Sequence, residues 1–133
     1  MYSMKAVCKE TNMPYETLKF YCNEGLVPNV KRNSNNYRVF DDEDIAWIKS
    51  LSCLKKCGMS IAEMKEYVAL CLQGKKTIPE RKLMLHHRKK ILLEKLQEIN
   101  NSIDYIDTKQ KFYDDVLTGN RPYLSNLIKI SND

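Results

Sequence analysis

The most reactive side chains in this 133-residue chain are thiols and imidazoles. No two cysteines have the Cys-x-x-Cys spacing of a zinc or redox site, and the two histidines are adjacent rather than at metal-ligand spacing. We therefore expect neither a metal site nor a disulfide framework. The closest two cysteines are four residues apart, which on a helix separates Cβ atoms by about 5–6 Å, wider than the ~3.8 Å of a disulfide. The residues concerned are Cys8, Cys22, Cys53, Cys57, Cys71, His86 and His87.

Enzymatic chemistry is not indicated by the remaining residues. The sequence has no glycine-rich phosphate loop, no paired catalytic constellation and no cluster of metal ligands. We therefore expect a protein that is not an enzyme and that uses no cofactor. No apolar run approaches the roughly 18 residues of a membrane span, and the N-terminus lacks a signal-peptide pattern, so we expect a cytoplasmic protein with no membrane partner. The net charge of +5 is compatible with a polyanionic partner.

Two short helices are predicted near the N-terminus. Ser3 is a suitable N-cap for a helix over roughly residues 4 to 10, which ends at a polar turn. A second helix begins at Met13 and Pro14, because proline is tolerated in a first helical turn, and ends at Gly25. Two short helices joined by a tight turn form a helix-turn-helix, whose second helix fits the major groove of DNA.

A β-hairpin is predicted after the second helix. A basic loop with Lys31 and Arg32 leads to a run of strand-forming residues, 37–40. Asn35 and Asn36 precede that run and tolerate the positive φ of a hairpin turn. Cations near the tip of such a hairpin are typical of a wing. The first domain is therefore predicted to be a winged helix-turn-helix, in a mainly α-helical protein with a small β wing.

Two further helices complete the expected first domain, residues 1–73. Asp41 should cap a third helix, which Gly58 ends, and Ser60 with Glu63 forms a capping box for a fourth. The spacing of apolar residues predicts one buried stripe on each helix. These stripes are Ile45, Ile48, Leu51 and Leu54, with Trp47 beside them, and Ile61, Met64, Tyr67, Val68 and Leu72.

A long dimerisation helix is predicted over residues 80–118, between a linker loop at 74–79 and a short tail at 119–133. Eight apolar residues fall on heptad positions, with Lys89 and Gln110 as polar exceptions. Such a helix, roughly 55–60 Å long, cannot bury its seam against so small a domain, so we expect a homodimer. Folding back as a hairpin would need a turn signal before Gly119, and none is present. The frame itself leaves parallel and antiparallel pairing open. The seam residues are Leu85, Leu92, Leu96, Ile99, Ile103, Ile106, Tyr113 and Leu117.

At these residues the chain resembles the MerR family of bacterial transcription regulators. The resemblance is carried in order by Tyr2-Ser3-Met4, Thr17-Leu18-Lys19-Phe20-Tyr21, Glu24-Gly25-Leu26-Val27-Pro28, Asn36-Tyr37-Arg38-Val39-Phe40, Asp42-Glu43-Asp44 and Gly58-Met59-Ser60. It implies an antiparallel coiled coil, a near-palindromic promoter element that is bent and untwisted, and RNA polymerase nearby. The chain departs from the family in having Lys19-Phe20-Tyr21-Cys22 for Arg-Tyr-Tyr-Glu and Asn36 for glycine.

Candidate contacts to double-stranded DNA follow from the winged helix-turn-helix. For the groove they are Tyr15, Thr17 and Lys19; for phosphate and positioning they are Tyr21, Lys31, Arg32, Tyr37 and Arg38. The alternative for the aromatic residues, including Phe20 and Phe40, is packing in the core.

The stretches 44–61 and 107–113 further resemble the aldehyde- and thiol-stress-responsive branch of the family, which has a single cysteine at the place of Cys53. No cysteine lies in residues 118–133, which argues against the metal-sensing branch. Lys49 and Lys56 project to the side of Cys53 and favour a thiolate, whereas the helix C-terminus opposes one. The alternative is a cysteine with a packing role only.

Two other functions remain open. One is a regulator induced by an apolar ligand held non-covalently at the dimer interface and the tail residues Tyr123, Leu124, Leu127 and Ile128. The other is a DNA-architectural protein that bends DNA without activating transcription.

Overall fold

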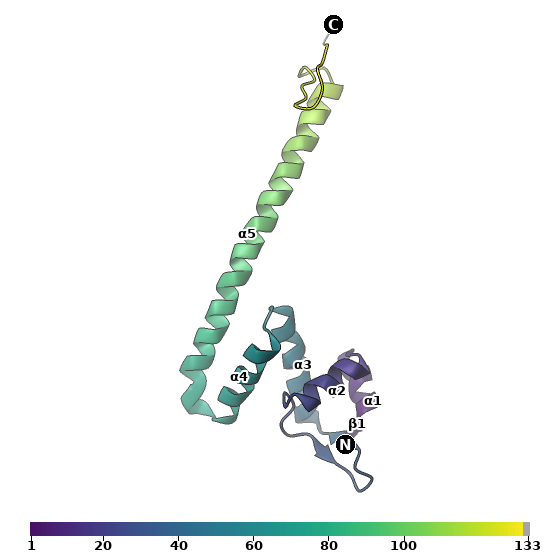
Figure 1. Ribbon diagram of the computed structural model, residues 1–133, viewed down its shortest axis with the longest axis vertical. Helices are drawn as coiled ribbons and strands as arrows, with labels where there is room; N and C mark the ends of the chain where they lie inside the picture. The colour runs from purple at the N-terminus through teal and green to yellow at the C-terminus, as the bar shows by residue number, and fades with distance from the viewer. Residues whose placement is uncertain (132–133) are drawn as a thin grey trace. The chain divides into compact units, whose positions relative to one another are not determined.

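The computed structural model describes residues 1–131 and is mostly helical (Figure 1). The chain divides into two compact units, Met1–Lys90 and a second that begins at Ile91. The first contains β1 (Tyr2–Ser3), α1 (Met4–Thr11), α2 (Tyr15–Asn23), β2 (Lys31–Arg32), β3 (Arg38–Phe40), α3 (Asp42–Lys56), α4 (Ile61–Leu72) and the 3-10 helix η1 (Lys75–Thr77). The division falls within α5 (Ile78–Leu117).

Side-chain caps set the starts of α1, α3 and α4, and a left-handed residue ends α1. The Ser3 hydroxyl accepts the Ala6 N–H at 3.1 Å, as predicted. Asn12 ends α1 in the left-handed region, with φ of 54°, a conformation that asparagine tolerates better than most residues. Asp41 caps α3 through the Asp44 N–H at 2.8 Å, and Asp44 returns the bond in a full capping box. The predicted capping box of α4, from Ser60 and Glu63, is confirmed.

The wing is part of a three-stranded antiparallel sheet in the order β1-β3-β2. The hairpin pairs Lys31 with Val39 and Arg32 with Arg38, and Asn36 takes the predicted positive φ, 63°. β1, which pairs Tyr2 with Phe40, was not predicted from the sequence. This strand places the N-terminus of the chain beside the wing.

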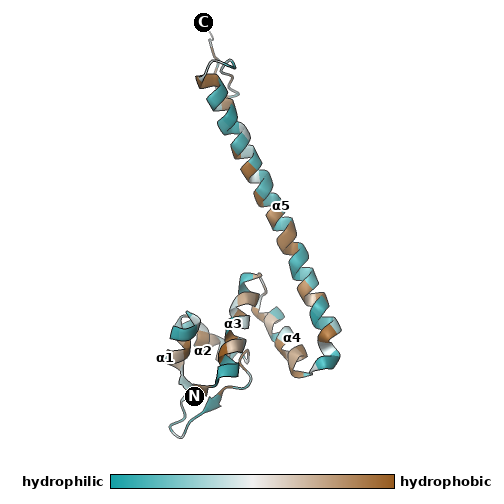
Figure 2. Ribbon diagram, turned by 180° about the vertical axis from the view of Figure 1, so that it is seen from behind, coloured by the Kyte–Doolittle hydropathy of each residue, from teal (hydrophilic) through white to brown (hydrophobic). Residues whose placement is uncertain are grey.

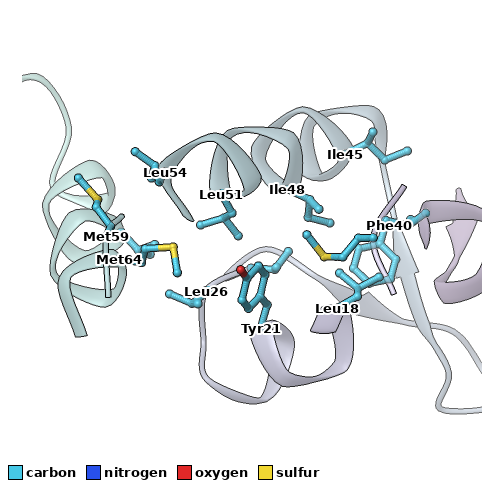
Figure 3. Packing of buried hydrophobic residues seen from close by; sticks show 14 residues of the cluster. Leu18, Tyr21, Leu26, Phe40, Ile45, Ile48, Leu51, Leu54, Met59 and Met64 are labelled. Carbon is cyan, nitrogen blue, oxygen red and sulfur yellow. The ribbon is translucent and has the colours of Figure 1, made fainter. Parts of the chain in front are cut away.

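One apolar core holds the first unit together. Side chains from α2 and α3 meet in it, and Figure 3 shows Leu18 and Tyr21 of α2 facing Ile48 and Leu51 of α3. The predicted stripe of α3 is buried along its whole length. The Trp47 indole N–H donates to the Leu26 carbonyl at 2.7 Å, which ties α3 to the segment after α2.

Two expectations for α4 and the following loop are wrong. Leu72, predicted on the buried face of α4, is 62% exposed because it lies in the last turn of the helix. Residues 74–79 are not all loop: they contain η1 and the start of α5, which begins at Ile78 rather than near residue 80. Pro79 does not interrupt this helix, since a first-turn proline lacks only an N–H that would have no helical partner.

The start of α5 is bonded to α4 within the first unit. Arg81 donates to the Thr77 hydroxyl at 3.1 Å and also to the Gly74 carbonyl. About two turns after Arg81, the Arg88 Nη2 lies 2.8 and 3.0 Å from the two carboxylate oxygens of Glu63. These contacts hold the start of α5 against α4 within the first unit.

The side chains of α5 are exposed or only half-buried along the whole helix. Of the forty residues described for α5, none is buried. Apolar positions recur along it among polar ones (Figure 2), and the eight predicted seam residues are between 38% and 84% exposed. In the tail beyond Gly119, the Arg121 guanidinium lies 5.8 Å from the centre of the Phe112 ring. Within residues 1–131, none of the helices combines the length and apolar character that a membrane span requires.

Candidate nucleic-acid interface

The start of α2 and the wing line one surface depression of about 300 Å³. Tyr15 contributes from the first position of α2, and Arg32, Tyr37 and Arg38 contribute from the wing. Tyr15 and Tyr37 are 52% and 69% exposed, so neither ring is used in the core. The depression therefore combines two cations with two exposed phenols, a set suited to phosphate and base edges.

The remaining groove candidates lie further along α2. Lys19 is exposed, one turn after Tyr15, and Thr17 is half-buried. Phe20, for which core packing was the alternative, is 45% exposed beside them. Phe40 is fully buried, in agreement with the core-packing alternative.

Tyr21 lies in the core rather than on this surface. Only 4% of the residue is exposed, and burial raises the pKa of its phenol. The helical spacing already placed it on the same side as Leu18, which is fully buried. Its position favours a packing role over the phosphate contact expected from the sequence.

The wing is held in a fixed shape by its asparagines. The Asn33 side-chain oxygen accepts the N–H groups of Asn35 and Tyr37, both at 3.0 Å. The Arg32 guanidinium donates to the Asn36 carbonyl at 2.8 Å. The tip is thus organised by hydrogen bonds within the wing itself.

Arg38 connects the wing to α2. Its Nη2 donates to the Asn23 side-chain oxygen at 2.6 Å, near the end of the helix. The half-buried Cys22 lies close enough for the guanidinium charge to act on its thiol, but burial dominates and raises the pKa of Cys22. The Lys31 ammonium lies 3.6 Å from the Asp41 carboxylate, and the Lys31 side chain remains 60% exposed.

Besides Asn36 of the wing, three residues that line the depression were not among the predicted DNA contacts. Ser3, Met4 and Lys5 line it from the N-terminal end of α1. They reach the wing because β1 pairs with β3, and a strand of two residues leaves no periodic pattern to detect. Lys5 adds a further exposed cation to this surface.

The five cysteines, all within the described residues, are free thiols with different surroundings. Cys53 on α3 is exposed, whereas the other four are half-buried. Burial raises the pKa of the Cys8 thiol as well as that of Cys22. In residues 1–131, no group of three or more potential ligands comes together to hold a metal ion.

Comparison with known proteins matches this architecture. The family model of the MerR HTH family regulatory protein matches residues 2–71. An uncharacterized HTH-type transcriptional regulator of Haemophilus influenzae is 32% identical over 112 residues, which cover 84% of this chain and 83% of that protein. The HTH-type transcriptional regulator AdhR of Bacillus subtilis is 38% identical over 88 residues, which cover 66% of this chain and 63% of AdhR.

Two solved structures share the fold over most of their length. HiNmlR, a MerR family regulator lacking the sensor domain and bound to promoter DNA, is 31% identical with a TM-score of 0.73, over 88% of this chain and 93% of its own. A MerR family regulator from Listeria monocytogenes is 26% identical with a TM-score of 0.80, over 90% of each chain. The chain therefore belongs to the MerR family of helix-turn-helix regulators, which are DNA-binding transcription factors and not enzymes.

Proposed function

We propose that this regulator acts as a homodimer that binds a near-palindromic promoter element and distorts it. The observation that carries the proposal is the shared depression of α2 and the wing, where Tyr15, Arg32, Tyr37 and Arg38 meet on an exposed surface. The relative HiNmlR is bound to promoter DNA, which supports the same class of ligand here.

The residues of this surface have different roles in the proposal. Tyr15, Thr17 and Lys19 enter the major groove with α2, because they lie on its first two turns, where helix-turn-helix proteins contact base edges. Lys31, Arg32 and Tyr37 contact the phosphate backbone beside the groove. Arg38 both contacts phosphate and keeps the wing against α2 through Asn23. Tyr21 is left out because it is buried.

The second copy is proposed from the exposed seam of α5. The eight seam residues are apolar or aromatic and recur at heptad spacing, and exposing them to water costs roughly 1.5–3 kcal/mol for each large side chain that could be buried. A second copy of the same helix covers them, as in a coiled coil. Two recognition helices are then held at a fixed separation, which suits two half-sites.

Distortion of the DNA is the mechanism that the family resemblance implies. Binding contacts supply the energy to bend and untwist an unfavourable promoter spacer, so that RNA polymerase nearby can use it. In vitro transcription from the bound site tests this step. A rise in transcript with added protein supports it, whereas bending without transcript supports the architectural alternative.

A gel-shift experiment on DNA flanking the gene tests the contact surface. Arg32→Ala and Tyr37→Ala should each weaken binding about tenfold, and Arg32→Ala should also lower the dependence of affinity on salt, by roughly one counterion. Lys111→Ala, an exposed lysine of α5 outside the seam, is the matched charge control and should have no effect. Tyr21→Phe should also bind DNA normally. A loss of affinity would show that the Tyr21 hydroxyl contacts DNA after all.

We further propose that Cys53 is the sensing residue, modified by an electrophile or oxidant. It is the exposed thiol, and Lys49 and Lys56 lie on its side of α3 by helical spacing. Mass spectrometry after mild aldehyde or diamide treatment should find Cys53 modified before the half-buried Cys57. If Cys53 stays unmodified while other thiols react, the proposal fails.

The same cysteine separates two modes of induction. Cys53→Ser should abolish induction by electrophiles and leave DNA binding intact. Induction that survives this substitution favours the alternative of an apolar ligand bound non-covalently. The candidate binding site for such a ligand is then the tail, since Tyr123, Leu124 and Leu127 line a cavity of about 560 Å³ together with the end of α5.

A further inference from the structure

The exposed face of α2 carries an acidic residue, Glu16, that the proposed function does not use. At about 100° per residue, Tyr15, Lys19, Asn23, Glu16 and Phe20 lie within an arc of about 140° around the helix. All five are exposed. The wing adjoins this face, since Tyr15 lines the depression shared with the wing and Asn23 accepts a hydrogen bond from a wing arginine. Glu16 therefore lies among the residues that α2 presents to the major groove in the proposed function.

The Glu16 carboxylate is unpaired. No ion pair or side-chain hydrogen bond among residues 1–131 involves it, although Lys19 lies one turn away on the same face. An unpaired negative charge on a surface that binds a polyanion opposes binding to every DNA sequence alike, because it repels phosphate. A carboxylate at this place offsets that repulsion only where the DNA offers it a hydrogen-bond donor.

The chemistry of a carboxylate limits the base that it can recognise. An ionised glutamate accepts hydrogen bonds and donates none. In the major groove, cytosine presents its N4 amino group as a donor, whereas guanine and thymine present acceptors. Adenine places the N7 acceptor beside its N6 amino donor. Cytosine is thus the base whose edge attracts a carboxylate without also repelling it.

We propose that Glu16 is a specificity-determining residue that accepts a hydrogen bond from the N4 amino group of a cytosine in each half-site. The inference rests on the proposed function and adds one base to the operator. Lys19 suits the paired guanine, because its ammonium only donates. Residues three apart on a helix have Cβ atoms about 5–6 Å apart, so Glu16 and Lys19 can act on the same or the next base pair. The exposed ring of Phe20 has no hydroxyl and does not compete for the cytosine.

Glu16 also has a possible structural role that the same experiment must separate. An acidic residue in the first turn stabilises a helix, because its charge interacts with the positive end of the helix dipole. In that role, replacement of Glu16 changes the stability of the protein and leaves its preferred DNA sequence unchanged. The two roles therefore differ in base preference.

Selection of binding sites from a pool of random duplexes tests the proposal, because it needs no known operator. The full-length chain is compared as wild type, Glu16→Gln and Glu16→Ala, with Glu66→Ala, at an exposed acidic position of α4, as the matched control. Glutamine has nearly the shape of glutamate but pairs with the N6 and N7 atoms of adenine. We expect the wild type to select a near-palindrome with a cytosine at one position of each half-site. Glu16→Gln should select adenine at that position.

Competition gel shifts with the selected duplexes give the size of the effect. Replacement of the cytosine should weaken binding of the wild type roughly tenfold, and binding of Glu16→Ala by less than about twofold. Glu16→Ala should also bind unrelated duplexes more tightly than the wild type does, since a charge that repels phosphate has been removed. Glu66→Ala should keep the wild-type consensus.

Loss of the cytosine from the consensus of both Glu16 variants supports the proposal. A consensus that is the same for the wild type and both variants overturns the role of Glu16 and leaves the proposed function standing, as does a wild-type consensus without the cytosine. If the wild type selects no near-palindrome at all, the proposed function itself fails.

Discussion

The helix-turn-helix unit and the seam of α5 contain the same kinds of apolar residues with opposite burial. Ile48 and Leu51 of α3 are fully buried, whereas Ile99 and Ile103 of α5 are 56% and 49% exposed. The first set packs against the wing, α2 and α4, all of which lie within ninety residues of one chain. The second set has the regular heptad spacing of a surface that a similar helix covers. The comparison teaches that the apolar residues of the first region are covered within one chain, whereas those of the second are left exposed by it.

The largest effect expected is on association. Ile99→Asp introduces a charge into the seam twice per dimer, and an unpaired charge removed from water costs several kcal/mol. We expect the dissociation constant of the dimer to rise at least roughly a hundredfold, about 2.7 kcal/mol. Sedimentation velocity across a dilution series measures it, with Lys111→Asp as the matched control outside the seam. Unchanged association would show that α5 does not pair through these residues.

The next effect is confined to the helix-turn-helix unit. Leu18→Ala removes a fully buried side chain between α2 and α3 and should lower the free energy of unfolding of this unit by about 2–5 kcal/mol. Leu72→Ala, at a 62% exposed position, should change it by no more than about 0.5 kcal/mol. Urea denaturation followed by circular dichroism measures both. Equal effects would mean that the core is not centred where Figure 3 places it.

A pH-dependent effect is expected at the junction of α4 and α5. The Arg88 guanidinium, with the Ser60 N–H, holds the pKa of Glu63 below the ordinary glutamate value of 4.5. Because the pKa is lowered in the folded protein, the ionised Glu63 stabilises the fold in full at pH values above 4.5. This stabilisation is lost as the pH falls through the lowered pKa of the folded state. Glu63→Gln should therefore cost about 1–3 kcal/mol at pH 7, because the Arg88 side chain is only 12% exposed and loses its charged partner.

Denaturation of wild type and Glu63→Gln at several pH values measures this contribution. The difference between the two proteins should shrink as the pH is lowered from 7 to 3. A difference that is the same at both ends of this range would show that the ion pair does not stabilise the junction.

The smallest effect is expected in the wing. Asn36 has a φ of 63°, which glycine adopts without the steric cost of a side chain. Asn36→Gly should change the free energy of unfolding by no more than about 1 kcal/mol, since easier turn geometry is opposed by greater freedom in the unfolded chain. Asn36→Val should destabilise the wing and weaken DNA binding, because a β-branched residue is strained at this φ. Gel shifts with both variants separate turn geometry from the asparagine side chain.

Structural features that depend on a local hydrogen bond, such as the start of a helix, could be predicted from the sequence. Ser3, Asp41 and Ser60 each bond to a backbone N–H three residues on, so the starts of α1, α3 and α4 could be located from residue type and spacing. Pro79 was misjudged because proline both ends helices and begins them, and its neighbours did not distinguish the two cases. The predicted start of α5 was therefore two residues late.

The site was less predictable because its parts are joined by tertiary packing. The helical spacing of α2 placed Tyr21 beside Leu18, but the resemblance to a DNA-contacting motif favoured the surface, and the core prevailed. Phe20, the neighbouring aromatic residue, is the exposed one. The participation of Met4 and Lys5 depends on the pairing of Tyr2 with Phe40 across 38 residues of chain, which no local pattern reveals.

Sedimentation equilibrium of the full chain at micromolar concentration is the most direct measurement of whether the seam of α5 requires a second copy. We expect a particle with twice the chain mass of 15.6 kDa, which binds a palindromic duplex as one dimer. A folded particle of 15.6 kDa that ignores such duplexes would contradict the proposed dimer and its use of paired recognition helices.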